Sequence, residues 1–118
     1  MNMEYPVWQT TSMELHRCNS YITNPEKLKE FFKGLCEKIK MTPFGKPIII
    51  RFGKGELEGY TAVQFIETSS INFHGEETGM RAFIDITSCK EFNGKKAGDY
   101  CKSFFEADKI RYRTFPRV

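Results

Sequence analysis

Reactive side chains are most dense in one stretch of the chain, between Thr61 and Cys89. A hydroxyl group, a nearby imidazole and a thiol can serve as a nucleophile, a base and an acid. The same residue types also occur in an ordinary hairpin with a surface histidine and a buried cysteine, so residue types alone leave both interpretations open. The stretch contains Thr61, Glu67, Thr68, Ser69, Ser70, His74, Glu76, Glu77, Asp85 and Cys89.

Four carboxylates in this stretch suggest a second kind of site. Glu67, Glu76, Glu77 and Asp85 could gather in one acidic cleft, which would suit a cationic amine or amino acid. A solvated turn at Glu76 and Glu77 explains two of them equally well.

The cysteines do not indicate a metal site. Cys18, Cys36, Cys89 and Cys101 stand far apart, and no two of them form a C-x-x-C pair. Zinc sites usually contain such close ligand pairs, so we expect no bound metal. Cys36 and Cys101 fall in helical patterns as small core residues, whereas Cys89 follows a strand pattern.

Two helices are predicted to position the reactive stretch. Asn24 is suited to cap a helix whose first residue is Pro25, and a breaker cluster at 43–47 ends its pattern. A second helix is predicted over 95–107. Each helix has one apolar stripe at helical spacing. The stripes are Leu28, Phe31, Phe32, Leu35 and Ile39 in the first helix, and Ala97, Tyr100, Cys101, Phe104 and Phe105 in the second.

Alternating or β-branched segments predict six strands. This order of elements indicates an α+β fold, a two-layer sandwich in which a mostly antiparallel sheet has two helices on one face. We expect a single domain over residues 1–118, and we expect the uncovered sheet face to meet another subunit. The predicted strands cover residues 12–18, 48–52, 60–67, 70–74, 80–87 and 109–115.

Length and composition narrow the functional classes. The 118 residues suit one domain, and the 40% hydrophobic content suits a packed core. No apolar run reaches the ~20 residues that span a bilayer. Residues 1–10 lack a secretory pattern, so we expect a cytoplasmic protein without a membrane partner. The net charge is only +3, and we interpret Arg111, Arg113 and Arg117 as solvated strand residues, with nucleic-acid contact as the alternative.

The spacing of three residues carries a family resemblance. Ser69 lies five residues before His74, and Cys89 lies fifteen residues after it. The segment from Arg81 to Cys89 (RAFIDITSC) alternates small and apolar residues around an aspartate and ends in a short polar stretch. With the order of elements, these features resemble the small prokaryotic S-adenosylmethionine decarboxylases. The motif-level similarity covers residues 61–90.

The resemblance implies a self-processing, pyruvoyl-dependent decarboxylase of polyamine synthesis, with the two-layer sandwich of that family and a homodimeric assembly. Ser69 would cut the chain before itself and become the pyruvoyl group, the electron sink for decarboxylation. His74 would act as the base of self-processing, and Thr61 stands where the family has a processing serine. Cys89 would reprotonate the decarboxylated carbon. No other cofactor is implied.

Some positions depart from the family pattern. Thr68 precedes Ser69 where the family has glutamate, and Glu67 lies one position earlier. Glu76 and Thr78 occupy the positions of the adenine-holding aromatic and the ribose-binding glutamate. Glu77 is the neighbouring carboxylate that could bind ribose.

With these replacements, Phe52 is a candidate for stacking on adenine. The departures leave an alternative open. The chain would then be an unprocessed, non-catalytic homologue that binds a small amine-bearing ligand or a partner protein.

Overall fold

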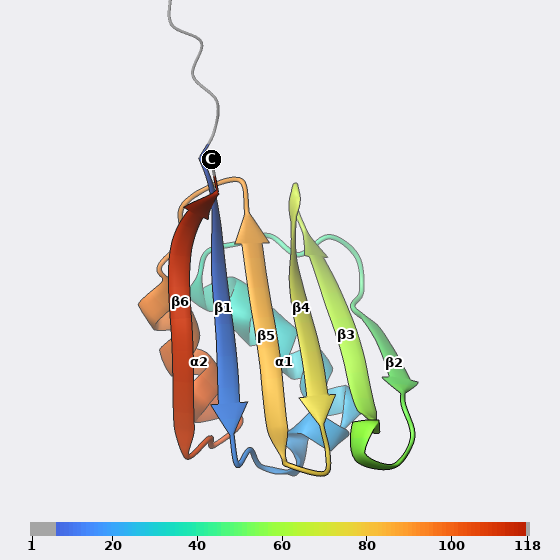
Figure 1. Cartoon of the computed structure of the whole chain (residues 1–118). Coiled ribbons are helices and arrows are strands. Elements are labelled where there is room, and N and C mark those ends of the chain that lie inside the picture. The colour runs from blue at the N-terminus through green and yellow to red at the C-terminus, as the bar shows by residue number, and fades with distance from the viewer. Residues whose placement is uncertain (1–6, 118) are drawn as a thin grey trace, which may run out of the picture.

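Six strands form one antiparallel sheet in the computed structural model, which describes residues 7–117 (Figure 1). The strand order is β2-β3-β4-β5-β1-β6, so the first strand lies between two later ones. The prediction about a secretory pattern concerns residues 1–10, and residues 1–6 of these lie outside the range that the structure describes. The strands are β1 (Trp8–His16), β2 (Ile48–Phe52), β3 (Gly59–Ile66), β4 (Ser69–Glu76), β5 (Arg81–Ser88) and β6 (Lys109–Arg117).

Helices α1 (Pro25–Lys38) and α2 (Gly94–Phe104) lie side by side behind the sheet in Figure 1, which leaves the other face uncovered. The Asn24 side chain accepts hydrogen bonds from the backbone of Glu26 and Lys27, at 3.0 and 3.2 Å. Asn93 caps α2 in the same way, through the amide of Lys96. These caps satisfy amides that have no partner inside the helix. The predicted two-layer α+β sandwich is confirmed.

The core lies between the helices and the sheet and is centred on Phe31 of α1. Its ring lies within 6.3 Å of five other aromatic rings, measured between centroids. From the sheet side, alternate residues of each central strand point into this layer and are buried, as a period of two requires. On β5 the buried residues are Ala82, Ile84, Ile86 and Ser88.

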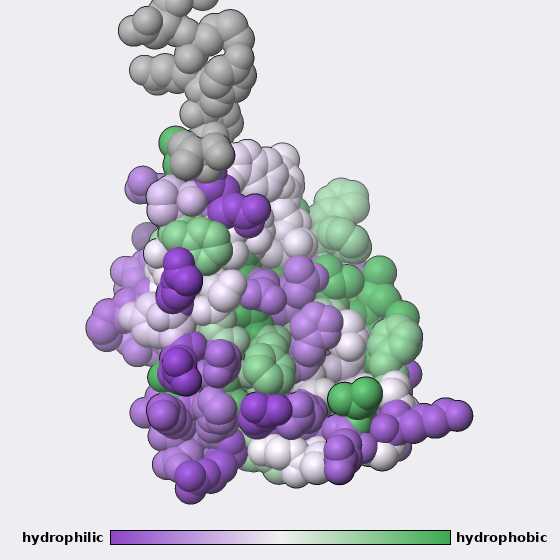
Figure 2. Space-filling model, in the orientation of Figure 1, coloured by the Kyte–Doolittle hydropathy of each residue, from purple (hydrophilic) through white to green (hydrophobic). Residues whose placement is uncertain are grey.

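The uncovered sheet face is divided into two halves (Figure 2). Over β2 and β3 it exposes large apolar side chains, which form the green area on the right of the view. We call these residues the apolar half-face: Ile48, Ile50, Phe52, Val63 and Phe65. Over β1 and β6 the same face is mostly polar and charged, in purple. Because the helices lie on the other face, packing against them does not explain why these apolar side chains are present.

The predicted elements are all present, and their ends differ from prediction by a few residues. The first strand begins at Trp8 rather than Ser12 and ends before Arg17, which has a left-handed φ of 53°. The second helix ends at Phe104 rather than Ala107. Between β3 and β4, which were predicted over 60–67 and 70–74, Glu67 and Thr68 form a two-residue turn.

The glycine-rich segment after β2 is a turn in which Gly53 and Gly55 have φ values of 82° and 58°, and it includes a 3₁₀ turn (Gly55–Leu57). Neither described helix is both long and apolar enough to cross a membrane.

Candidate active site

A tight turn joins β3 to β4 and brings several of the candidate residues together. Ile66 pairs with Ser69 across the hairpin, so Glu67 and Thr68 form the turn itself. Thr68 has a left-handed φ of 63°, a sparsely populated conformation for a β-branched residue. Such strained residues are concentrated at functional sites.

Cys89 lies beside this turn because β5 pairs with β4 in antiparallel fashion and ends where β4 begins. The amide of Cys89 donates a hydrogen bond to Ser69 Oγ, at 3.1 Å. The Cys89 sulfur lies 2.7 Å from Thr68 Oγ1, which also contacts the carbonyl oxygen of Glu67, at 2.5 Å. We call Glu67, Thr68, Ser69 and Cys89 the turn cluster.

Cys89 differs from the other three cysteines in exposure. It is half-buried, whereas Cys18, Cys36 and Cys101 are buried. Burial disfavours the thiolate and raises the pKa of Cys18 and of Cys36 to about 11, and it raises the pKa of Cys101 further. Cys89 is thus the thiol best placed to exchange a proton with a bound molecule.

The remaining two catalytic candidates lie together on the uncovered face. Thr61 and His74 are directly opposite each other on β3 and β4, and Thr61 Oγ1 lies 3.3 Å from His74 Nδ1. Thr61 and Phe52 line the same apolar hollow of about 400 Å³. We call Thr61, His74 and Phe52 the histidine cluster.

The two clusters are far apart within one chain. Ser69 and His74 are five residues apart on one strand, which corresponds to ~16 Å at the usual rise per residue. They also point to opposite faces, since Ile71 and Phe73, which alternate with His74, are buried under the helices. One chain alone therefore does not bring the predicted nucleophile and the predicted base together.

The glutamates proposed for substrate binding are held by arginines. Glu76 accepts two hydrogen bonds from Arg81, at 2.9 and 2.8 Å, and Glu77 accepts two from Arg51, at 2.5 and 2.9 Å. Arg51 also contacts Glu58. Hydrogen bonds from the guanidinium groups lower the pKa of both Glu76 and Glu77, so both carboxylates are charged. A cationic ligand would have to compete with these arginines.

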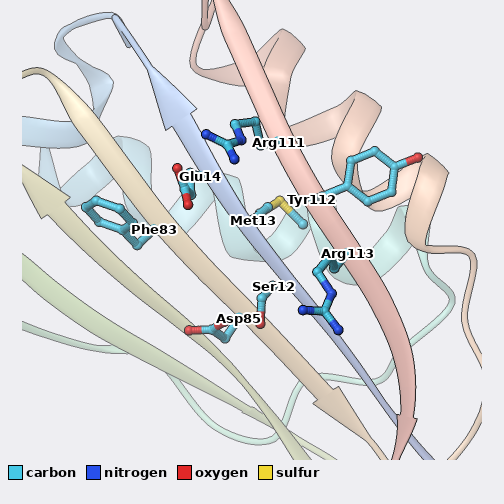
Figure 3. A pocket seen from close by; sticks show the side chains of 8 residues that line it. All are labelled: Ser12, Met13, Glu14, Phe83, Asp85, Arg111, Tyr112 and Arg113. Atoms are coloured by element: carbon cyan, nitrogen blue, oxygen red, sulfur yellow. The ribbon is translucent and has the colours of Figure 1, made fainter.

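The four carboxylates do not gather in one cleft. Glu67 lies at one end of the β3–β4 hairpin, and Glu76 and Glu77 lie at the other. Asp85 lies in a separate hollow of about 520 Å³ on the uncovered face, together with Glu14, Arg111 and Arg113 (Figure 3). The two arginines offset the charge of the acids there, so this hollow is not an acidic amine site.

Two contacts of the site were not predicted from sequence. One is the contact of Thr68 with Cys89, which follows from the register once the turn is known to contain two residues. The other is the pairing of Arg51 with Glu77, which depends on how β2 lies against the β4–β5 turn. Among residues 7–117, no three metal-binding side chains lie close enough to hold an ion.

Comparisons with known proteins identify the family and a similar fold. No curated protein sequence matches the chain significantly. The crystal structure of the adenosylmethionine decarboxylase from Aquifex aeolicus VF5 superposes with a TM-score of 0.78 and covers 97% of this chain and 92% of its own. The two sequences are 18% identical, so this likeness concerns the fold alone. The family model described as S-adenosylmethionine decarboxylase matches residues 9–118, nearly the whole chain, and the chain therefore belongs to the S-adenosylmethionine decarboxylase family.

Proposed function

We propose that this protein is a decarboxylase of S-adenosylmethionine or a related cationic amino acid, acting in polyamine synthesis, and that it makes its own catalytic group by cutting itself at the β3–β4 turn. Family membership supports the reaction class. The turn cluster is the observation that carries the proposal, because it joins chain hydroxyls to a half-buried thiol at a strained turn.

The turn cluster fits the formation of a pyruvoyl-type group. By position, Ser69 is the residue that would form it. The turn lies at the ends of β3 and β4, beyond their last residue pair, so the two ends produced by a cut could separate without breaking the pairing of β3 with β4. When present, such a group supplies an electron sink for decarboxylation. The residues around it must then orient the substrate, exclude water and move one proton.

Cys89 is the proposed proton donor to the decarboxylated carbon. Its amide is hydrogen-bonded to Ser69 Oγ, so its backbone is fixed next to the residue that would carry the catalytic group. A general acid must lie within hydrogen-bond reach of the atom that it protonates. In the described chain, the other thiols are buried in the core and cannot meet this requirement.

We further propose that the complete site forms between two copies of the chain. The histidine cluster lies ~16 Å along β4 from Ser69, too far for proton transfer within one chain. A second copy that packs against the uncovered face would also cover the apolar half-face, where Ile50 and Phe65 are each 46% exposed. In this arrangement the turn cluster of one protomer meets His74 of the partner subunit.

The first test is intact-mass spectrometry of purified protein after long incubation, followed by a decarboxylation assay with S-adenosylmethionine. We expect two fragments that meet within residues 67–69, and release of carbon dioxide by the cut protein. The control is the double variant Thr68→Ala with Ser69→Ala, which has no hydroxyl at the turn and should stay intact. A wild-type chain that remains uncut contradicts the proposal and favours the non-catalytic homologue, which would bind an amine-bearing ligand or a partner protein.

The shared site has a separate test. Cys89→Ala and His74→Ala should each abolish activity when expressed alone. Coexpressed, they should recover about a quarter of wild-type activity, since half of the randomly assorted dimers are mixed and each of these has one intact site of two. No recovery in mixed dimers, detected by native mass spectrometry, would place both residues in a site formed by one chain.

A further inference from the structure

We infer that Thr68, rather than Ser69, is the hydroxyl that cuts the chain, so that the Glu67–Thr68 peptide bond breaks and the downstream fragment begins with a 2-oxobutanoyl group. The inference rests on the proposed self-processing and changes only the bond that is cut and the group that is left. The group remains an α-keto acyl electrophile, with one more methyl carbon than a pyruvoyl group.

The position of the Thr68 hydroxyl is the first argument. A serine or threonine cuts before itself when its oxygen attacks the carbonyl carbon of the preceding residue, so the oxygen must lie beside that carbonyl. Thr68 Oγ1 donates a hydrogen bond to the carbonyl oxygen of Glu67, at 2.5 Å, so the hydroxyl lies beside that carbonyl group. Ser69 Oγ instead accepts a hydrogen bond from the amide of Cys89 and begins the row of β4 side chains that faces the helices.

The Cys89 sulfur supplies the second argument. It lies 2.7 Å from Thr68 Oγ1. The hydrogen of this hydroxyl points to the Glu67 carbonyl oxygen, and rotation about the Cβ–O bond turns it to the sulfur. A cysteine sulfur can take up a proton from a neighbouring hydroxyl as a thiolate and return it as a thiol. The side chain of Ser69 is connected to Cys89 only through the backbone amide, which cannot act as a base.

Backbone strain supplies the third argument. Thr68 has a φ of 63°, where Cβ crowds the neighbouring backbone and a β-branched residue is especially disfavoured. The carbonyl carbon of Glu67 is one of the four atoms that define this angle. Cutting the Glu67–Thr68 bond removes that atom and releases the strain, whereas cutting after Thr68 leaves the angle in place.

Cutting by Thr68 passes through an ester between its side chain and Glu67. Thr68 Oγ1 bonds to the Glu67 carbonyl carbon and the peptide C–N bond breaks, which leaves an ester and a free amine on Thr68. Loss of the Thr68 α-proton and of the Cβ–O bond releases Glu67 as a carboxylate. The resulting enamine becomes an imine, and one water hydrolyses it to the 2-oxobutanoyl group with release of ammonia. No oxidant or reductant is consumed.

The test is intact-mass spectrometry with four proteins: wild type, Thr68→Val, Thr68→Ser and Ser69→Ala. Valine keeps the β-branched shape of threonine and removes only the hydroxyl, so Thr68→Val is the matched control. We expect wild type to be cut between residues 67 and 68, with a downstream fragment that carries a 2-oxobutanoyl mass. Thr68→Val should remain whole, Ser69→Ala should be cut like wild type, and Thr68→Ser should leave a pyruvoyl group at residue 68.

Each other outcome has a defined meaning. A wild-type cut between residues 68 and 69, with a pyruvoyl mass on the downstream fragment, overturns the inference and leaves the proposed function standing. A wild-type chain that stays whole overturns both. Unfolding curves identify any variant that fails to fold. If a variant fails, borohydride reduction of the wild-type fragment identifies the residue that was cut, because the reduced 2-hydroxybutanoyl and lactoyl ends differ in mass.

Discussion

The two faces of the sheet are built by the same alternation of side chains but have different surroundings. Toward the helices, the residues are almost all apolar and buried, for example Ile84 and Ile86 on β5. Toward the uncovered face, the same strand carries Phe83 and Asp85, which are half-buried with no helix over them. Packing within this chain explains why the residues of the covered face are apolar. It does not explain which residues occupy the uncovered face.

The two faces therefore have different roles: the covered face stabilises the fold, and the uncovered face carries candidate functional residues. The covered face excludes water, which makes it the main source of stability. The uncovered face holds His74 and Thr61, the apolar half-face and the hollow around Asp85. Large apolar side chains there would reduce solubility unless something covers them, and a second copy of the chain is the cover that we propose.

The largest predicted difference between the faces is in the free energy of unfolding. Phe31 is fully buried among five rings, so Phe31→Ala should lower this energy by about 3–5 kcal/mol. Phe65 is 46% exposed on the uncovered face, so Phe65→Ala should cost no more than about 1 kcal/mol in the isolated chain. Urea unfolding at low protein concentration measures both values. An equal loss in the two variants would show that the uncovered face also stabilises the single chain.

Much of the covered face was predictable from sequence, because its causes are local. Asn24 and Pro25 indicate the start of α1, and residues such as Phe31 and Leu35 at helical spacing define its buried side. The pairing order of the strands is not local. The insertion of β1 between β5 and β6 depends on contacts between residues such as Met13 and Ile84, which are far apart in the sequence.

The site was less predictable, for the same reason. The sequence analysis grouped Ser69, His74 and Cys89 by their spacing. Five residues along an extended strand separate Ser69 from His74 in space, so only Ser69 and Cys89 are in contact within one chain. Two neighbouring strands bring Cys89 back to the turn, which required the register of β4 with β5. The left-handed φ of Thr68 is imposed by the turn, and the presence of a β-branched residue at this position does not predict it.

The next prediction concerns the cover of the uncovered face. Ile50→Glu should weaken association of two chains, because a symmetric interface would bury two new charges among apolar side chains. We expect the dissociation constant to rise by at least about tenfold, equivalent to ~1.4 kcal/mol. Analytical ultracentrifugation over a range of concentrations measures it.

Leu57→Glu is the matched control for this variant. Leu57 is 78% exposed in the turn after β2 and lies outside the apolar half-face, so the same change there should leave association unaltered. If both variants associate like wild type, or if wild type is monomeric at all concentrations, the uncovered face is not an interface between copies.

The smallest predicted effect comes from the ion pairs at the end of the β3–β4 hairpin opposite the turn cluster. The hydrogen bonds from Arg81 lower the pKa of Glu76 below its ordinary value of 4.5, and Arg51 does the same for Glu77. A carboxyl group whose pKa is lower in the folded chain binds protons less readily there than in the unfolded chain. Its stabilising contribution is therefore complete above pH ~4.5 and is lost as the pH falls through the lower, folded-state pKa.

Both glutamates lie near solvent, so screening keeps the loss for Glu76 to no more than about 0.5 kcal/mol. Urea unfolding between about pH 5 and pH 3 should show a shallower decline in Glu76→Gln than in wild type, because the variant has no proton to bind at this position. Salt at about 1 M, where the Debye length is ~3 Å, should reduce the difference between the two proteins. Parallel pH curves would contradict the prediction and show that the pair with Arg81 does not stabilise the folded chain relative to the unfolded one.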